Sequence, residues 1–319
     1  MERAKVSIVL PCYNGADTIE RAVRGILNQT YRPIQLILVN DGSTDATEQV
    51  ICSMREEIAQ AQIEFLYWPQ ENLGLGGAVN SGLKHVTGEY LAWVDADDEL
   101  MPESVELRVN FLEQNRDYGS VSSNAIFAED RDWNRPLGKL TDNILLNSEA
   151  DQFTHLLMGR SIFCCGCHLV RKSVFIEANG GMDIYPARHG QNWQMLLPVY
   201  YASKHAFLDL PLYKYRTNAD SMSAAVEKMP MNQLCLRRQE YLAIVGNTLR
   251  RITGMRDKER DAYLRLFKKH IYELNLDSAL EKQERLAILK WRIVVKWVNM
   301  TGGKASLHGS RWDNAENHR

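Results

Sequence analysis

Strand-like runs alternate with helix-like segments four times in the first hundred residues, and this alternation limits the fold most. Continuous apolar runs rich in β-branched residues predict buried strands, and apolar residues at spacings of three and four predict helices. The predicted strands are 6–10, 34–39, 63–67 and 90–94, and the predicted helices are 17–29, a segment ending near 59, 76–84 and 104–114. Because the links are short, we expect an α/β fold with a mostly parallel sheet and helices on both faces.

Polar clusters follow three of these strands. They read Cys12-Tyr13-Asn14, Asn40-Asp41-Gly42-Ser43 and Asp95-Ala96-Asp97-Asp98. In open α/β sheets, ligands bind beyond the carboxyl ends of the strands. One such cluster would indicate a turn, whereas three would converge on a single binding crevice.

The third cluster carries three carboxylates in four residues. Carboxylates this close repel one another unless a cation compensates them, and a divalent ion held by one or two carboxylates plus phosphate oxygens fits the pattern. The alternative is an acidic first turn that caps a following helix. The glycine-rich Gly74-Leu75-Gly76-Gly77 favours the first interpretation, because glycines let the backbone approach a phosphate, although the Gly-Lys-Ser/Thr ending of a P-loop is missing.

In this order and spacing, the sequence resembles the nucleotide-sugar glycosyltransferases of family 2, which have the GT-A fold. The resemblance covers about residues 5–223 and is most specific over 5–105. The segments that carry it are Val6-Ser7-Ile8-Val9-Leu10-Pro11-Cys12-Tyr13-Asn14, Ile26-Leu27-Asn28-Gln29-Thr30-Tyr31, Val39-Asn40-Asp41-Gly42-Ser43-Thr44-Asp45, Asn72-Leu73-Gly74, Ala78-Val79-Asn80-Ser81-Gly82, Gly88-Glu89-Tyr90, Asp95-Ala96-Asp97-Asp98, Gly180-Gly181-Met182-Asp183 and Leu210-Pro211-Leu212-Tyr213-Lys214-Tyr215-Arg216.

The resemblance implies roles for individual residues. Pro11 and Tyr13 would line the nucleobase pocket, and Asp41 would hydrogen-bond the base, usually uracil. Asp95 would reach the ribose or the sugar, and Asp97, with Asp95 beside it, would hold Mn²⁺ or Mg²⁺ against the diphosphate. The metal would neutralise charge on the leaving nucleoside diphosphate during an inverting displacement, while a side-chain base deprotonates the acceptor hydroxyl.

The segment that carries this base in many relatives departs from the pattern. Where they have Gly-Glu-Asp-Trp, this chain has Gly190-Gln191-Asn192-Trp193, and a carboxamide cannot accept the proton. Asp183 and His189 are the nearest candidate bases. Gln191 and Asn192 are candidate contacts to sugar hydroxyls, or simply the capped start of a helix. A third possibility is a catalytically silent subunit that binds a nucleotide sugar without transferring it.

A second departure follows Tyr215-Arg216, where many relatives have a histidine two positions on and this chain has Asn218. Arg216 is a candidate partner for the diphosphate, or else a surface arginine. The Gln-x-x-Arg-Trp signature of processive synthases is missing from the sequence, which favours transfer of one sugar per encounter.

The formal net charge of −2 conceals two oppositely charged parts. Residues 1–225 carry 19 Lys and Arg against 29 Asp and Glu, whereas residues 226–319 carry 19 against 11. We expect a GT-A domain at 1–225, a helical region at 226–301 and a disordered tail at 302–319. The chain as a whole is not basic, which argues against a nucleic-acid partner.

The basic part contains an amphipathic segment at 282–304 with six Lys and Arg and one acidic residue. Apolar residues recur there at spacings of three and four, namely Leu286, Leu289, Ile293, Trp297 and Met300. This pattern is typical of a helix on an anionic membrane surface, and the alternative is a helix packed on its own domain. With no secretory signal or membrane-spanning run in the sequence, we expect a cytoplasmic protein on the inner membrane face, acting on a lipid-linked glycan acceptor in surface polysaccharide synthesis.

Six cysteines are present, three of them in Cys164-Cys165-Gly166-Cys167-His168. Structural zinc usually takes two separated ligand pairs, and no second cluster is found. Buried, reduced thiols are therefore the favoured interpretation.

Overall fold

The chain is described here by a computed structural model for residues 3–143, 152–217, 225–226 and 228–301. The predicted tail at 302–319 lies outside the described residues. One twisted sheet forms the centre, with strand order β3-β2-β1-β4-β8-β6-β9-β5 and β7 paired to β6. Its strands are β1 (Val6–Cys12), β2 (Ile34–Asp41), β3 (Glu64–Gln70), β4 (Tyr90–Trp93), β5 (Glu99–Leu100), β6 (Tyr118–Ala128), β7 (Gly138–Lys139), β8 (His168–Arg171) and β9 (Lys204–Arg216).

The first four strands are parallel, as the sequence predicts. Beyond β4 the sheet is mixed, because β8 pairs antiparallel with both β4 and β6, whereas β6 and β9 are parallel. The carboxyl ends of β1, β2 and β4 therefore lie at one edge, where their loops meet. Short β5 then pairs antiparallel with the end of β9 and returns the chain toward that same edge.

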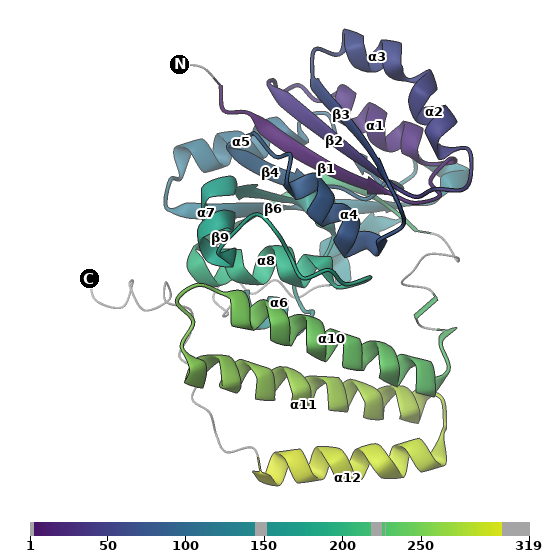
Figure 1. The fold of residues 1–319 in the computed structure, drawn as a ribbon. Helices are drawn as coiled ribbons and strands as arrows, with labels where there is room; N and C mark the ends of the chain where they lie inside the picture. The colour runs from purple at the N-terminus through teal and green to yellow at the C-terminus, as the bar shows by residue number, and fades with distance from the viewer. Residues whose placement is uncertain (1–2, 144–151, 218–224, 227, 302–319) are drawn as a thin grey trace.

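Helices cover both faces of the sheet (Figure 1). Alternate residues of β1 explain the division, since Ile8 and Leu10 pack toward α1 and α5 while Val9 packs toward α4. The helices of this part are α1 (Ile19–Leu27), α2 (Thr47–Ser53), α3 (Arg55–Gln60), α4 (Gly74–Leu83), α5 (Ser104–Gln114), α6 (Gln152–Leu157), α7 (Lys172–Asn179) and α8 (Gln191–Ala202). The predicted helix ending near 59 is divided into α2 and α3 at Met54.

Three long helices follow β9: α10 (Met231–Arg251), α11 (Asp257–Glu281) and α12 (Arg285–Thr301). Figure 1 shows them as successive layers beneath α8, so that α10 packs on the sheet domain and α12 is outermost. Their sequence patterning is consistent with this order, because α10 and α11 contribute Val245, Leu249, Tyr263 and Phe267 to the core shared with α8.

The amphipathic segment forms α12 and has two apolar sides. Its inner side packs Trp291, which is 7% exposed, against Met231, Leu234 and Ala279. Its outer side leaves five large apolar residues exposed, from 58% to 86%: Leu286, Leu289, Ile293, Trp297 and Met300. We call these five residues the outer ridge. Among the described residues, no helix combines the length and apolarity needed to cross a membrane.

Candidate active site

The loops after β1 and β2 are hydrogen-bonded to each other. The Asn14 N–H donates to Ser43 Oγ (3.0 Å), and Asn14 Oδ1 accepts from the Thr44 N–H (2.8 Å). Asp45 accepts from the Ala16 N–H (3.0 Å) and from Thr47. Two strand ends far apart in sequence thus form one continuous surface.

The predicted nucleobase residues lie on this surface. Asp41 ends β2 and is 3% exposed, and its Oδ1 accepts from Gln70 Nε2 (2.7 Å) and from the Leu73 N–H (2.9 Å). Pro11 is buried within β1, whereas the Tyr13 ring is exposed. One carboxylate oxygen of Asp41 is therefore used to hold the loop that leads into α4.

That loop ends at Gly74, whose φ of +76° favours glycine. Two residues on, the Gly76 N–H donates to the carbonyl oxygen of Ala187 (3.0 Å), and a Cβ at Gly76 would lie 2.3 Å from that oxygen. The start of α4 and the segment around Ala187 are consequently in direct backbone contact. This contact positions Arg188 and His189 beside the strand ends.

The acidic triplet follows β4 and leads into β5, not into a helix. Helix capping therefore does not explain it. Asp95 is half-buried, and burial together with the charge of Asp97 raises its pKa to about 6. Asp98 is buried, and burial and then its two acidic neighbours raise its pKa well above the usual range. Its Oδ1 accepts from the Arg216 N–H (2.7 Å), while its Oδ2 has no hydrogen-bond partner among the described residues.

A carboxylate whose pKa is raised by a neighbouring carboxylate, as that of Asp95 is by Asp97, is suited to a divalent cation that compensates the repulsion. Asp97 is accessible, with 43% of its side chain exposed, and burial is the main cause of its raised pKa. Within the described ranges, no cluster of three or more His, Cys, Asp and Glu residues is placed to hold a metal. Asp95 and Asp97 thus fit a metal that takes further oxygens from a phosphate ligand.

Arg216, at the end of β9, forms ion pairs with two acidic residues. Its Nε donates to Asp130 Oδ2 (2.7 Å), and its Nη1 lies 3.9 Å from Asp97 Oδ2. Arg21 also pairs with Asp130 (3.3 Å) and donates from Nη2 to the Asp97 carbonyl oxygen (2.9 Å). The guanidinium of Arg216, which the resemblance predicts to bind the diphosphate, is therefore paired with Asp130 in this structure.

The segment that carries Asp130 is fastened by Trp133. The Arg21 guanidinium lies 3.5 Å from the centroid of this ring, and Trp133 Nε1 donates to Glu99 Oε2 (2.5 Å). Lys214 Nζ lies 3.3 Å from the same carboxylate oxygen. Trp133 is thus held between α1, β5 and β9.

A cavity of about 750 Å³ opens between the strand ends, the start of α8 and α10. Asp95 lines it, as do His189, Gln191 and Asn192 from the segment that departs from the resemblance. Aromatic and cationic side chains complete the wall, including Phe127, Phe163, Trp193, Tyr215, Arg237 and Tyr241. The cavity is polar near the carboxylates and aromatic elsewhere, which suits a sugar.

Both polar atoms of the Asn192 side chain are hydrogen-bonded within the protein. Its Oδ1 accepts from Trp93 Nε1 (3.1 Å), and its Nδ2 donates to the Phe163 carbonyl oxygen. Asn192 is the second residue of α8, and the helix is preceded by Gly190, which has a left-handed conformation with φ +72°. These bonds support the structural role considered for Asn192, whereas Gln191 remains a candidate sugar contact.

The two candidate bases lie in different places. Asp183 pairs with Arg251 of α10 (2.7 Å) and does not line the cavity. His189 lines it, and burial and then the Arg237 charge lower its pKa. Since arginine can only donate, the 3.4 Å contact from Arg237 Nη2 to His189 Nδ1 makes this nitrogen the acceptor and places the hydrogen of the neutral ring on Nε2.

The cysteine cluster is buried beside the carboxylates. Cys164 and Cys165 are buried, and their burial raises the pKa of each thiol well above its usual value. Thiols with raised pKa values are poor metal ligands at neutral pH.

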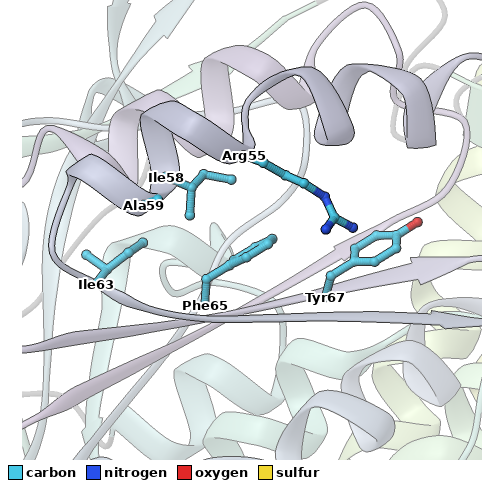
Figure 2. Close-up of a pocket in the computed structure, with 6 residues that line it drawn as sticks. All are labelled: Arg55, Ile58, Ala59, Ile63, Phe65 and Tyr67. Atoms are coloured by element: carbon cyan, nitrogen blue, oxygen red, sulfur yellow. The ribbon is translucent and has the colours of Figure 1, made fainter.

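A separate hollow of about 380 Å³ lies between α3 and edge strand β3 (Figure 2). Figure 2 shows Ile58, Ile63 and Phe65 lining it, with Arg55 and Tyr67 toward one end. None of the predicted site residues lines this hollow. The chemistry is therefore sought at the strand ends.

Comparison with known proteins relates this geometry to a family. Residues 7–178 match the family model described as glycosyl transferase family 2. An uncharacterized glycosyltransferase of Rickettsia typhi is 41% identical over 107 residues, covering 34% of this chain and 31% of that protein. Glycosyltransferase GlyA of Streptococcus pneumoniae is 28% identical over 251 residues, covering 76% of this chain and 35% of that protein. The match thus spans about a third of each relative's length.

Solved structures share the fold. TarS residues 1–349 of S. aureus, solved with UDP-GlcNAc, has a TM-score of 0.63 at 15% identity, covering 91% of this chain and 79% of that one. The mannosyltransferase PcManGT of Pyrobaculum calidifontis, solved with GDP-Man and Mn²⁺, has a TM-score of 0.51 at 17% identity, covering 93% and 85%. The predicted GT-A fold is confirmed.

Proposed function

Because the chain belongs to glycosyl transferase family 2, we propose that it transfers one sugar from a UDP-sugar to a hydroxyl of a glycan acceptor. The observation that carries the proposal is the cavity lined by both Asp95 and the start of α8. The donor surface with Tyr13 and Asp41 is linked to it through the loop that Asp41 holds at Leu73, two residues before the cavity residue Leu75. The UDP-GlcNAc bound to TarS supports UDP as the nucleotide. In this proposal residues 1–225 form the donor-binding domain and residues 226–301 a helical region.

On the donor side, Tyr13 offers an exposed ring for the nucleobase, Pro11 is buried in β1 two residues before it, and Asp41 accepts from the base through its second oxygen. Gly74 allows the backbone to approach the diphosphate. Arg216 binds the diphosphate after exchanging Asp130 for it, because both are oxygen anions that suit the guanidinium. Asp95 and Asp97 hold Mn²⁺ or Mg²⁺, which neutralises charge on the leaving diphosphate when bound. The Mn²⁺ in PcManGT supports this assignment.

On the acceptor side, His189 is the candidate base, since it lines the cavity and its lowered pKa keeps the imidazole neutral at pH 7. Accepting the hydroxyl proton on Nε2 requires the ring hydrogen to be on Nδ1. Arg237 must therefore release Nδ1 before the step. Asp183 would have to leave Arg251 to serve instead.

The carboxamide of Asn192, which cannot act as a base and whose two polar atoms are held by internal hydrogen bonds, favours a second candidate, a silent subunit that binds a nucleotide sugar. Titration with UDP and Mn²⁺, followed by UDP-release assays over a panel of UDP-sugars, separates the two. The enzyme predicts saturable UDP binding and turnover of at least one donor. UDP binding without turnover of any donor would support the silent subunit instead.

For the acceptor, the outer ridge supports a lipid-linked glycan at the inner face of the membrane. Its five apolar residues are flanked by the exposed cations Arg285, Lys290, Arg292 and Lys296. Apolar insertion combined with charge attraction binds helices to anionic bilayers. The protein would then be cytoplasmic and peripherally attached through 282–304.

Co-sedimentation with vesicles tests the attachment. Vesicles containing phosphatidylglycerol should bind the protein, neutral phosphatidylcholine vesicles should bind it weakly, and Ile293→Glu should weaken binding about 10-fold or more. Leu210→Glu, at an exposed apolar residue of β9, is the matched control. Equal binding by the Ile293→Glu variant would refute the attachment and leave the donor site unaffected.

A further inference from the structure

Helix α10 contributes a cation to the cavity. Arg237 lines it together with Tyr241, one turn further along the same helix. The Arg237 Nε donates to the Tyr241 hydroxyl (2.8 Å), and its Nη2 contacts His189 Nδ1 (3.4 Å). Both partners are neutral.

Three other arginines near the site, at α1 and at the ends of β9 and α10, are paired with acids. Arg216 and Arg21 share Asp130, and Arg251 pairs with Asp183 at 2.7 Å. Among the described residues, Arg237 has no carboxylate within the 4.0 Å of an ion pair, and Glu240 on the same helix is exposed and forms no such pair with it. A partly buried charge without a counterion is costly, and binding an anion removes that cost.

His189 adds a second donor beside Arg237. With Nδ1 accepting from the arginine, the neutral ring carries its hydrogen on Nε2, where it can donate to an anion. Gln191, which lines the same cavity, offers a carboxamide N–H₂. Guanidinium, imidazole N–H and amide donors together suit the oxygens of a phosphate or a carboxylate.

We propose that Arg237 and His189 form a subsite for an anionic group, a phosphate or a carboxylate, on the sugar acceptor or on the transferred sugar. The proposal rests on the donor site described above. The donor diphosphate is a poor candidate for this subsite, because Arg216 and the Asp95–Asp97 carboxylates provide for it at the ends of β9 and β4.

Calorimetric titrations test the subsite with two probes. The first is sn-glycerol 3-phosphate, added to protein saturated with UDP and Mn²⁺, which represents an anionic acceptor. The second compares UDP-glucuronic acid with UDP-glucose, which represents an anionic donor sugar. The variants are Arg237→Gln and Arg237→Lys, and the control is Arg250→Gln, which removes an exposed cation from the same helix.

We expect Arg237→Gln to weaken one probe about 10-fold, to leave the Kd of UDP within twofold, and to be partly rescued by Arg237→Lys. Loss confined to glycerol 3-phosphate places the anion on the acceptor, and loss confined to UDP-glucuronic acid places it on the donor sugar. Unchanged affinity for both probes would overturn the subsite, as would an equal loss of UDP itself. A separate titration of the wild-type protein with UDP and Mn²⁺ tests the donor site itself. Failure to bind UDP there would refute the donor site rather than the anion subsite.

Discussion

The loops after β1 and β2 carry the proposed donor surface, helix α10 lines the cavity with Arg237 and Tyr241, and the two regions are held in place differently. The loops after β1 and β2 are fixed by short hydrogen bonds between neighbouring polar groups, such as Asn14 with Thr44 and Asp41 with Leu73. Helix α10 is fixed by apolar packing of Val245 and Leu249 against the sheet domain, and by Arg251 with Asp183 at its end.

This difference separates two tasks. Hydrogen-bonded loops define positions closely and suit recognition of an invariant group such as a nucleoside diphosphate. A packed helix can present different side chains to the cavity without changing those loops. The predictions below therefore pair changes in the two regions.

The largest difference is expected from the same substitution, glycine to alanine, made at the start of α4 beside the strand ends and in α10. At Gly76 a Cβ would lie 2.3 Å from the Ala187 carbonyl oxygen, whereas at Gly246 in α10 the nearest atom is 3.6 Å away. Gly76→Ala should lower the free energy of unfolding by about 3 kcal/mol. Gly246→Ala should raise it by about 0.5–1 kcal/mol, because alanine favours helices. Urea denaturation measures both, and equal effects would remove the distinction between the regions.

Asp97→Ala should weaken binding of UDP in the presence of Mn²⁺ about 100-fold, because it removes a predicted metal ligand. Asp132→Ala, at an exposed acid of the nearby 3₁₀ helix, should leave binding unchanged. Calorimetry with and without Mn²⁺ provides the measurement. Metal-dependent UDP binding that persists in the Asp97→Ala variant would show that the metal site is elsewhere.

Acid should destabilise the sheet domain through its buried histidines. Burial lowers the pKa of His168 to about 3, and burial also lowers that of His205 well below its usual value. Below about pH 6.5 these histidines take up protons in the unfolded chain but not in the folded chain. The free energy of unfolding therefore decreases by about 1.4 kcal/mol for each unit that the pH falls, for each histidine. Replacing His168 with Phe, which keeps a ring against Trp93, should reduce the slope of unfolding free energy against pH, measured by urea denaturation at a series of pH values. An unchanged slope for the His168 variant would contradict this account.

The smallest effect is expected at Asp130. Asp130→Asn should release Arg216 and Arg21 and tighten UDP–Mn²⁺ binding about 3-fold, since partly exposed ion pairs contribute up to about 1 kcal/mol. Asp132→Asn serves as the control for charge alone. Weaker binding by Asp130→Asn would mean that Asp130 assists the donor.

Much of the fold could be predicted because its signals are local. Continuous apolar runs identified β1 to β4, and the polar residues after them could be expected to meet at one edge of the sheet, since parallel strands place their carboxyl ends together. The antiparallel insertion of β8 between β4 and β6 could not be predicted from the sequence, because strand order depends on long-range packing.

Only part of the proposed site could be predicted from the sequence. Asp95 and His189 were predicted and line one cavity, but Arg237 and Tyr241 are contributed by a helix that begins at Met231, and nothing in their local pattern distinguishes them from a helix surface. The ion pair of Asp130 with Arg216 also joins residues 86 positions apart. Two apolar sides of α12 could likewise not be distinguished from one broad side until its packing partners were known.

If the outer ridge of α12 rests on a membrane as proposed, its place in the fold determines how far a membrane-bound acceptor must reach. The ridge is on the exposed side of α12, opposite the side on which Trp291 packs against residues of α10 and α11, and the cavity lies between α10 and the start of α8. At least two helices, each about 10 Å across with its side chains, therefore separate them, a height of roughly 20 Å. If the ridge rests on the bilayer, a sugar attached directly to its lipid stays below the cavity, and only a longer glycan brings its terminal hydroxyl to Asp95. The helical layers would then act as a ruler that sets the minimum length of chain to be extended.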